Sequence, residues 1–261
     1  MTTTAPAPVT IEEVKKYWNE NVIGIEVTDK EPGTPEFFDD LERYYDIKYR
    51  EEEPYARHAD FAGKKLLEVG CGWGRDLIKY ARNGAIVTAV DLTESGVALA
   101  RKYLEYRGLK GDVRVASAED LPFADNSFDV VISIGVLMCT PNIQKAIDEI
   151  YRVLRPGGEA VIMLYHKWSW YNLLVRVSGI GYETQGVDAP LIATHSRRDV
   201  RRLFSKFSTI KMHMTGFPMK TVKRHGLLVG LYNSIFVPAF NALPRWLTRP
   251  IGWHIYIDLT K

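Results

Sequence analysis

Residues 66–76 read LLEVGCGWGRD, an apolar run that leads into a glycine-rich turn. A second apolar run, residues 86–90, ends at Asp91. The glycines of the turn let a ligand approach the backbone, and the N–H groups of the helix that follows point toward it. A carboxylate at the end of the next strand can accept hydrogen bonds from both hydroxyls of an adenosine ribose. The pattern predicts a nucleoside-binding turn between a strand and a helix. The side chain that binds the ribose lies at the end of the second strand.

The spacing of the glycines separates this turn from a dinucleotide fingerprint, which would place its third glycine where this chain has Arg75. Four further motifs follow in order: SAEDLPF at 117–123, DNSFDVV at 125–131, SIGVL at 133–137 and RVLRPGG at 152–158. Together with Glu68, which precedes the first glycine, they resemble the motifs of class I S-adenosylmethionine-dependent methyltransferases. The RVLRPGG turn is similar to that of the ubiquinone/menaquinone-methyltransferase-like branch.

The resemblance implies an α/β fold: a Rossmann-like, seven-stranded, mostly parallel sheet with helices on both faces, an N-terminal helical segment and cap insertions. It also implies S-adenosyl-L-methionine as the cofactor, with Glu68 near the methionine amine, Asp91 on the ribose and Leu92 against the adenine. The cofactor-binding residues that it implies are Glu68, Gly70, Cys71, Gly72, Gly74, Asp91, Leu92, Ser117, Ala118, Glu119, Ser133 and Ile134.

The alternation of apolar and helical stretches after residue 64 is typical of a parallel α/β sheet. The expected strands are 65–69, 86–90, 113–117, 128–134, 159–165, 209–214 and 254–259. Helices are expected at 75–83, 95–107 and 197–207, and Asn142 has the character of an N-cap for another. The segment from Trp168 to about Ser196 is aromatic and shows no regular pattern.

The chain divides into three parts on this reading. Residues 1–9 are expected to be a flexible tail, and residues 10–60 an aromatic-rich N-terminal helical preamble that opens on a capping box at Thr10 and Glu13. Residues 61–261 are the methyltransferase domain, with insertions at about 167–196 and 216–252. The start of the chain lacks the basic and apolar regions of a signal peptide, which favours a cytoplasmic protein.

Composition argues against several partners. A net charge of +2 and a pI near 8.4 are too mildly basic to indicate nucleic acid. The basic residues from Arg197 to Arg202 recur at helical spacing around apolar ones, which indicates a solvated helix face. Cys71 and Cys139 have no metal-ligand spacing, so no metal site is expected.

The stretch 226–243 contains no charged residue and approaches the length of a membrane span. A span would place two strands of one sheet on opposite sides of a bilayer, which disfavours it. A buried or cap-forming helical pair and a peripheral membrane contact both stay open. Trp168, Trp170, Phe236 and Phe240 give the two insertions an aromatic character that suits an apolar acceptor pocket.

The sequence therefore predicts a methyltransferase that acts on a small-molecule or lipid-like acceptor, at oxygen or carbon. His166, at the end of an expected strand, is the candidate catalytic residue. An RNA or protein methyltransferase that uses the basic face near Arg197 is one alternative. A cofactor-binding regulatory module without turnover is another, and the oligomeric state is left open.

Overall fold

The computed structural model describes residues 8–22, 24–178, 189–220 and 227–261. Within them the strands form one sheet in the order β3-β2-β1-β4-β5-β7-β6, in which β7 is antiparallel to both neighbours and the other pairs are parallel. The strands are β1 (Lys65–Val69), β2 (Ile86–Asp91), β3 (Asp112–Val115), β4 (Phe128–Ile134), β5 (Leu154–Tyr165), β6 (Thr209–Thr215) and β7 (His254–Thr260). The predicted Rossmann-like, mostly parallel sheet is confirmed.

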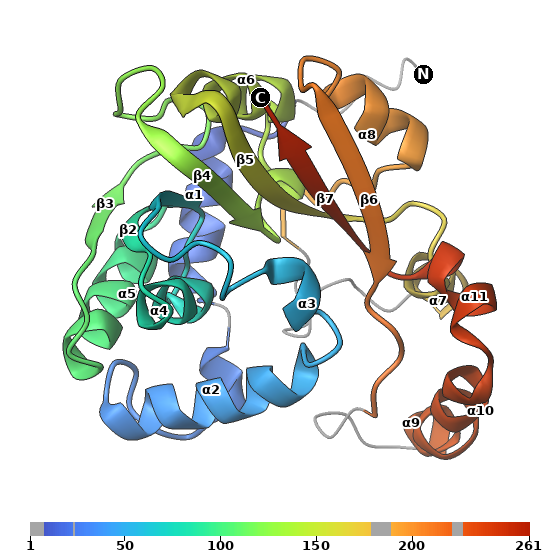
Figure 1. The fold of residues 1–261 in the computed structure, drawn as a ribbon. Helices are drawn as coiled ribbons and strands as arrows, with labels where there is room; N and C mark the ends of the chain where they lie inside the picture. Colours follow the sequence, from blue (N-terminus) through green and yellow to red (C-terminus); the bar gives the residue numbers. More distant parts are fainter. Residues whose placement is uncertain (1–7, 23, 179–188, 221–226) are drawn as a thin grey trace, which may run out of the picture.

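Short helical elements surround the sheet (Figure 1). They are α1 (Ile11–Glu20), η1 (Ile25–Val27), α2 (Pro35–Lys48), α3 (Glu53–Ala56), α4 (Arg75–Arg82), α5 (Glu94–Tyr106), η2 (Leu137–Cys139), α6 (Ile143–Val153), α7 (Trp170–Ser178), α8 (Arg197–Leu203), α9 (Leu227–Leu231), η3 (Tyr232–Phe236), α10 (Val237–Ala242), α11 (Arg245–Thr248) and η4 (Arg249–Ile251). Parts of the expected tail and of both insertions, residues 1–7, 179–188 and 221–226, lie outside the described residues.

Side-chain caps explain where several helices begin. The Thr10 hydroxyl accepts from the Glu13 N–H and the Glu13 carboxylate accepts from Thr10, which is the predicted capping box. Asn142 caps α6 through the N–H of Lys145 at 3.1 Å, also as predicted. These caps satisfy backbone N–H groups that have no partner within the helix.

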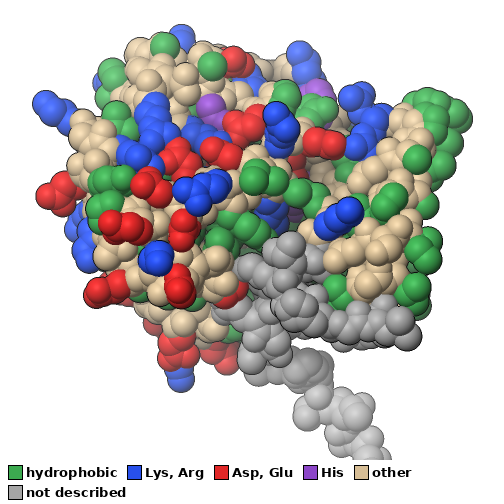
Figure 2. Space-filling model, turned by 90° about the horizontal axis from the view of Figure 1, so that it is seen from below, with side chains coloured by type: hydrophobic (Ala, Val, Ile, Leu, Met, Phe, Trp, Pro, Cys, Tyr) green, Lys and Arg blue, Asp and Glu red, His purple; other side chains and the backbone are tan. Residues whose placement is uncertain are grey.

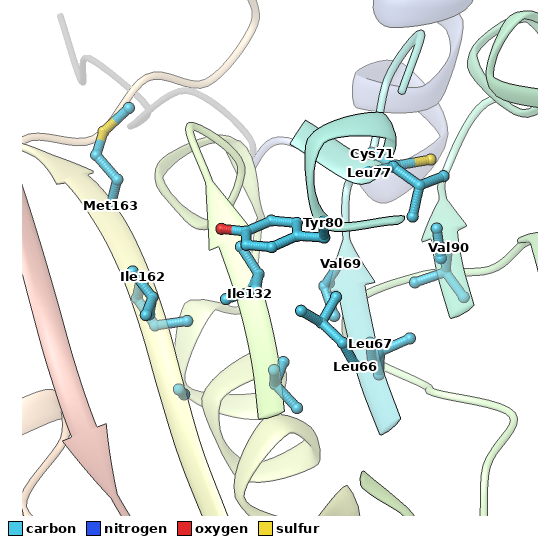
Figure 3. Close-up of a cluster of buried hydrophobic side chains, with 14 of the residues drawn as sticks. Leu66, Leu67, Val69, Cys71, Leu77, Tyr80, Val90, Ile132, Ile162 and Met163 are labelled. Atoms are coloured by element: carbon cyan, nitrogen blue, oxygen red, sulfur yellow. The ribbon is translucent and has the colours of Figure 1, made fainter. Parts of the chain in front are cut away.

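The core contains buried side chains of the strands and of α2, α4, α5, α6 and α8. Apolar side chains of β1, β4 and β5 are almost fully buried, and Figure 3 shows Tyr80 of α4 lying across Val69 of β1 and Ile132 of β4. The Tyr80 hydroxyl donates to the Ala56 carbonyl at 2.6 Å, so α4 is tied to the end of α3. This contact fixes the N-terminal helices against the sheet.

Most bounds shift by one or two residues, and three differences are larger. β5 begins at Leu154, because Leu154 pairs with Phe128 across a register shift and the RPGG turn is absorbed into the strand. Helix α7 occupies a segment expected to be irregular, where the Ser169 hydroxyl accepts from the Asn172 N–H at 3.1 Å. Helix α8 ends at Leu203 rather than at residue 207.

The carboxyl ends of the parallel strands meet at one edge of the sheet. Strand β1 lies between β2 and β4, so the chain order reverses there, and this is where open α/β sheets place their ligands. Figure 1 shows α2 and α3 at this edge, where the arrowheads of β4 and β6 point, and α7 and α9–α11 at the same end beside β6.

The second insertion packs on the first. The ring of Trp170 on α7 lies 6.0 Å from that of Phe236 and 5.9 Å from that of Phe240. The Trp170 indole also donates to the Gly216 carbonyl at 2.8 Å. The aromatic residues of the two insertions therefore form one cluster beside β6.

In the part of the chain that the structure describes, no helix is long and apolar enough to cross a bilayer.

Candidate functional site

A cleft opens at the carboxyl ends of β1, β2 and β4. Its floor is the glycine turn and its walls come from both halves of the chain. The lining residues are Ile11, Val14, Trp18, Val22, Tyr45, Tyr49, Glu52, Glu68, Val69, Gly70, Cys71, Gly72, Trp73, Arg75, Asp76, Asp91, Leu92, Thr93, Gly96, Ala116, Ser117, Ala118, Ile134, Gly135, Val136, Cys139, Thr140, Met163, Tyr165, His254 and Tyr256.

The three glycines of the turn are needed for different structural reasons. Gly70 has φ +81°, and a Cβ there would lie 2.3 Å from a methyl group of Val136, so only glycine fits between β1 and β4. Gly72 has φ +50°, and a Cβ there would meet no atom within 4 Å, so the space in front of it is open to a ligand. Gly74, outside the lining, lets α4 pack on Ala100 of α5.

Asp91 faces the cleft and also holds the turn in place. Its Oδ2 accepts from the Gly72 N–H at 2.8 Å, and its Oδ1 accepts from the N–H and hydroxyl of Thr93 at 2.9 and 2.6 Å. The carboxylate at the end of β2 is thereby fixed beside the glycine turn. It keeps lone pairs with which to accept hydroxyl groups of a ligand.

Glu68 is the buried acid of the cleft. Burial raises the pKa of its carboxyl well above the usual range, and the negative charges of Asp76 and Asp91 act in the same direction. Its Oε2 is buried and has no hydrogen-bond partner among the described residues. A cationic donor in the cleft would satisfy this oxygen and favour the ionised form.

A network of charges lies behind Glu68. Burial alone would raise the pKa of Asp76, but the Arg75 guanidinium and a 2.9 Å hydrogen bond from His58 hold it below its usual range. His58 also bonds Glu53 at 2.8 Å, and the Arg75 guanidinium lies 4.8 Å from the Tyr49 ring centroid. The network joins α2 and α3 to the first turn of α4 and so fixes the wall of the cleft.

The adenine-side residues are only partly brought together. Ser117, Ala118, Leu92 and Ile134 line the cleft with Cys71. Two other predicted residues lie outside the lining and have other partners. The Glu119 Oε1 accepts from the Asn142 N–H at 2.9 Å, which orders the start of α6. The Ser133 hydroxyl is buried and donates to the Val69 carbonyl at 3.0 Å, which ties β4 to β1.

The structure does not bring His166 to the cleft. The residue is buried beyond the end of β5, and its Nδ1 lies 3.0 Å from the Gly252 carbonyl. Burial lowers the pKa of its imidazole, while the hydrogen bond to Gly252 opposes the shift. In the described structure His166 joins the segments around β5 and β7, and Tyr165 is the residue of this pair that faces the cleft.

The sequence did not predict that the N-terminal helices form one wall of the cleft. Trp18, Tyr45, Tyr49 and Glu52 bring the N-terminal helices over the glycine turn, and His254 of β7 closes the far end. The density of aromatic residues before position 57 was the available signal, but a helical pattern does not say which surface it covers. By contrast, none of the described residues of α9–α11 lines the cleft, although the insertion was expected to cap it.

Comparison with known proteins now bears on this geometry. Residues 67–162, which span β1 to the middle of β5, match the family described as "Methyltransferase domain". Over these residues the chain is similar to that family. The match does not distinguish the ubiquinone/menaquinone-like branch from others.

Among curated relatives, a phthiotriol/phenolphthiotriol dimycocerosates methyltransferase of Mycobacterium tuberculosis is 40% identical over 105 residues, which cover 40% of this chain and 38% of that protein. A fatty-acid O-methyltransferase of Mycolicibacterium smegmatis is 38% identical over 125 residues, covering 46% and 43%. The similarity thus spans less than half the length of these relatives.

Solved structures share the fold over nearly the whole length of the chain. The magnesium protoporphyrin IX methyltransferase of Synechocystis PCC 6803, solved with bound SAH, has a TM-score of 0.61 at 14% identity and covers 97% of this chain and 100% of that one. The [4+2]-cyclase SpnF has a TM-score of 0.59 at 18% identity, with 100% and 99% covered. Because one of these folds serves a cyclase, the activity has to be argued from the site.

Proposed function

We propose that this protein transfers a methyl group from S-adenosyl-L-methionine to an oxygen of a lipid-like acceptor. The observation that carries the proposal is the composition of the cleft. Gly72, Asp91 and Glu68 line one space, and apolar and aromatic side chains form most of the rest. The turn at Gly72 is open, and the Glu68 Oε2 is buried without a hydrogen-bond partner among the described residues.

The cleft fits the cofactor in residue type. The Glu68 Oε2 would accept from the ammonium group of the amino-acid end, Asp91 from the ribose hydroxyls, and Leu92 and Ala118 would pack on the adenine. When bound, the cofactor supplies a methyl group on a positively charged sulfur. A nucleophile attacks the methyl carbon in line with the bond to sulfur, and the sulfur is the leaving group. The chain's own part is to hold both reactants in register and to exclude water from them.

The lipid-like acceptor is supported by two independent features. The relatives named above carry a dimycocerosate lipid or a fatty acid in their names, and the fatty-acid enzyme is an O-methyltransferase. The cleft itself offers apolar walls from Trp18, Val22 and Met163, which suit a hydrocarbon chain better than a charged polymer.

The decisive experiment supplies the protein with methyl-labelled cofactor and two cell fractions, an organic-solvent extract and the aqueous remainder. We expect label in the apolar fraction, and we expect hydriodic acid to release it as methyl iodide. The reagent cleaves the O–CH3 bonds of methyl ethers and esters and leaves C-methyl groups intact. Label that resists the reagent would refute transfer to oxygen. Label confined to the aqueous fraction would refute the lipid-like acceptor, and no turnover would refute the enzyme.

We further propose that the flank formed by α7 and α9–α11 rests on an anionic membrane surface that holds the acceptor. Leu173, Val177, Ile235 and Trp246 point into solvent, with Val177 79% and Trp246 73% exposed. Figure 2 shows apolar side chains along this flank, at the end of the molecule where the cleft opens, with Lys and Arg beside them. Burying such residues in a bilayer interface removes their contact with water.

Charge complements the apolar surface. Residues 200–257 contain no Asp or Glu, while Lys220 and Arg249 are exposed near the flank and Arg176 lies on α7. Anionic headgroups attract such cations by about 1 kcal/mol for each one near the surface. No acidic residue within this stretch opposes the attraction, and Glu51, which precedes α3, is paired with Arg245 of α11 at 2.8 Å.

Sedimentation with vesicles tests this docking face. The protein should bind phosphatidylglycerol-containing vesicles more strongly than pure phosphatidylcholine vesicles, and Ile235→Glu with Trp246→Glu should abolish binding. Ile86→Glu is the matched control, since Ile86 is 59% exposed at the start of β2, at the opposite end of the strands from the cleft. Equal loss in both variants, or equal binding to both vesicles, would refute the proposal.

A further inference from the structure

At one end of the cleft a carboxylate and a histidine from distant parts of the chain meet. Glu52 is the N-cap residue of α3, and His254 is the first residue of β7. The Glu52 Oε1 lies 2.9 Å from the His254 Nδ1, and both side chains are more than nine-tenths buried. Both residues line the same cleft as the glycine turn.

The pair has a defined hydrogen-bond polarity. The second oxygen of Glu52 accepts from the Tyr256 hydroxyl at 3.0 Å, so the carboxylate is an acceptor on both sides. A carboxylate next to a neutral imidazole requires the proton to be on Nδ1, which leaves Nε2 with a free lone pair. That Nε2 has no hydrogen-bond partner among the described residues.

The surroundings leave His254 as the proton acceptor at this end of the cleft. Burial, with the negative charge of Glu52, raises the pKa of Tyr256 well above its ordinary value, so its phenol stays protonated. Arg75 is cationic and engaged with Asp76. The ring of Tyr165 stacks on His254, with centroids 5.7 Å apart and planes 23° apart, and holds the imidazole at the end of β5.

We propose that His254 is the general base of this enzyme and that Glu52 is its positioning residue; this rests on the proposed function above. A neutral hydroxyl is a poor nucleophile and must lose its proton as it attacks. The His254 Nε2 takes that proton while the acceptor oxygen bonds to the methyl carbon. The methyl–sulfur bond breaks with its electron pair left on sulfur, and the imidazolium, paired with the Glu52 carboxylate, then releases its proton to water.

Two acceptors with the same alkyl chain and different phenol acidity distinguish a general base from a structural residue. One is a 4-alkylphenol, whose hydroxyl is neutral near pH 7 as in tyrosine. The other is the matching 4-alkyl-2-nitrophenol, assayed where it is already ionised. General-base catalysis contributes about 10²- to 10⁴-fold, so His254→Asn should lower kcat for the phenol by about that factor and leave kcat for the nitrophenolate within about threefold of wild type. The asparagine amide can still donate to Glu52.

Further variants keep the test falsifiable. Glu52→Gln should show the same selectivity for the neutral phenol with a smaller loss, since it disturbs the tautomer and not the base itself. His213→Asn is the matched control, because His213 also bonds a carboxylate, Asp258 at 3.0 Å, but lies outside the cleft lining. His166→Asn compares the candidate from the sequence directly.

Each outcome has one meaning. Cofactor affinity of the variants, measured by calorimetry, should equal that of wild type, because His254 contacts the acceptor only. Loss of both acceptors in equal proportion, or no loss for the phenol, would overturn the assignment of His254. If His166→Asn lowers kcat for the neutral phenol selectively, His166 is the general base. A wild-type protein that methylates neither phenol would refute the proposed function instead.

Discussion

Replacing Glu68 by glutamine tests the electrostatics of the cofactor site. In the folded protein the pKa of this carboxyl lies well above 4.5, mainly through burial. In the unfolded chain it returns to its ordinary value. Between the two values the folded state therefore holds one proton that the unfolded state has lost.

The sign and size of the effect follow from that single proton. This contribution to the free energy of unfolding is complete below the unfolded pKa and declines as pH rises toward the folded pKa. The slope is about 1.4 kcal/mol per pH unit for one proton. Glutamine cannot ionise, so the Glu68→Gln variant should gain stability relative to wild type by about that amount for each unit within the window.

Urea unfolding of both proteins at about pH 5, 6 and 7 measures the difference directly, and groups that titrate in both proteins cancel. Glu105→Gln, an exposed change on α5, is the control and should show a difference that does not vary with pH. Binding of S-adenosylhomocysteine, whose ammonium would favour the ionised carboxyl, should release a proton within this pH window in wild type only. A Glu68→Gln difference that is flat across pH would refute the argument.

Three other changes follow from the same site. Asp91→Ala should weaken cofactor binding by about 30- to 150-fold, equivalent to about 2–3 kcal/mol for a charge-assisted contact, and calorimetric affinity within threefold of wild type would contradict this. Gly70→Ala should destabilise the fold by at least the ~1–2 kcal/mol of a left-handed residue, because its Cβ also meets Val136, and adding Val136→Ala should recover part of the loss in thermal unfolding. Dialysis against a chelator should leave methyl transfer unchanged, since no group of three His, Cys, Asp or Glu side chains in the described part of the chain could hold a metal; activity lost and then restored by a divalent cation would contradict this.

The sheet and its nucleotide turn were predictable because their signals are local. An apolar run, a turn that only glycine can form and a cap such as Thr10 each act within a few residues, and neighbouring backbone geometry decides them. Asp91 was predictable for the same reason, as the carboxyl ends of adjacent parallel strands lie side by side. The start of β5 shifted because tertiary pairing overrode the local pattern there.

The sequence by itself therefore determined the α/β sheet, the glycine turn and the carboxylates that face it. Only the tertiary structure decided that the N-terminal helices form a wall of the cleft, that His166 turns toward Gly252, and that Glu52 meets His254. The last two residues lie 202 positions apart, and no periodicity or spacing records such a contact. Their pairing depends on the packing of α3 against β7, where burial strongly favours a hydrogen bond for each polar group. That packing exists only once the whole sheet has formed.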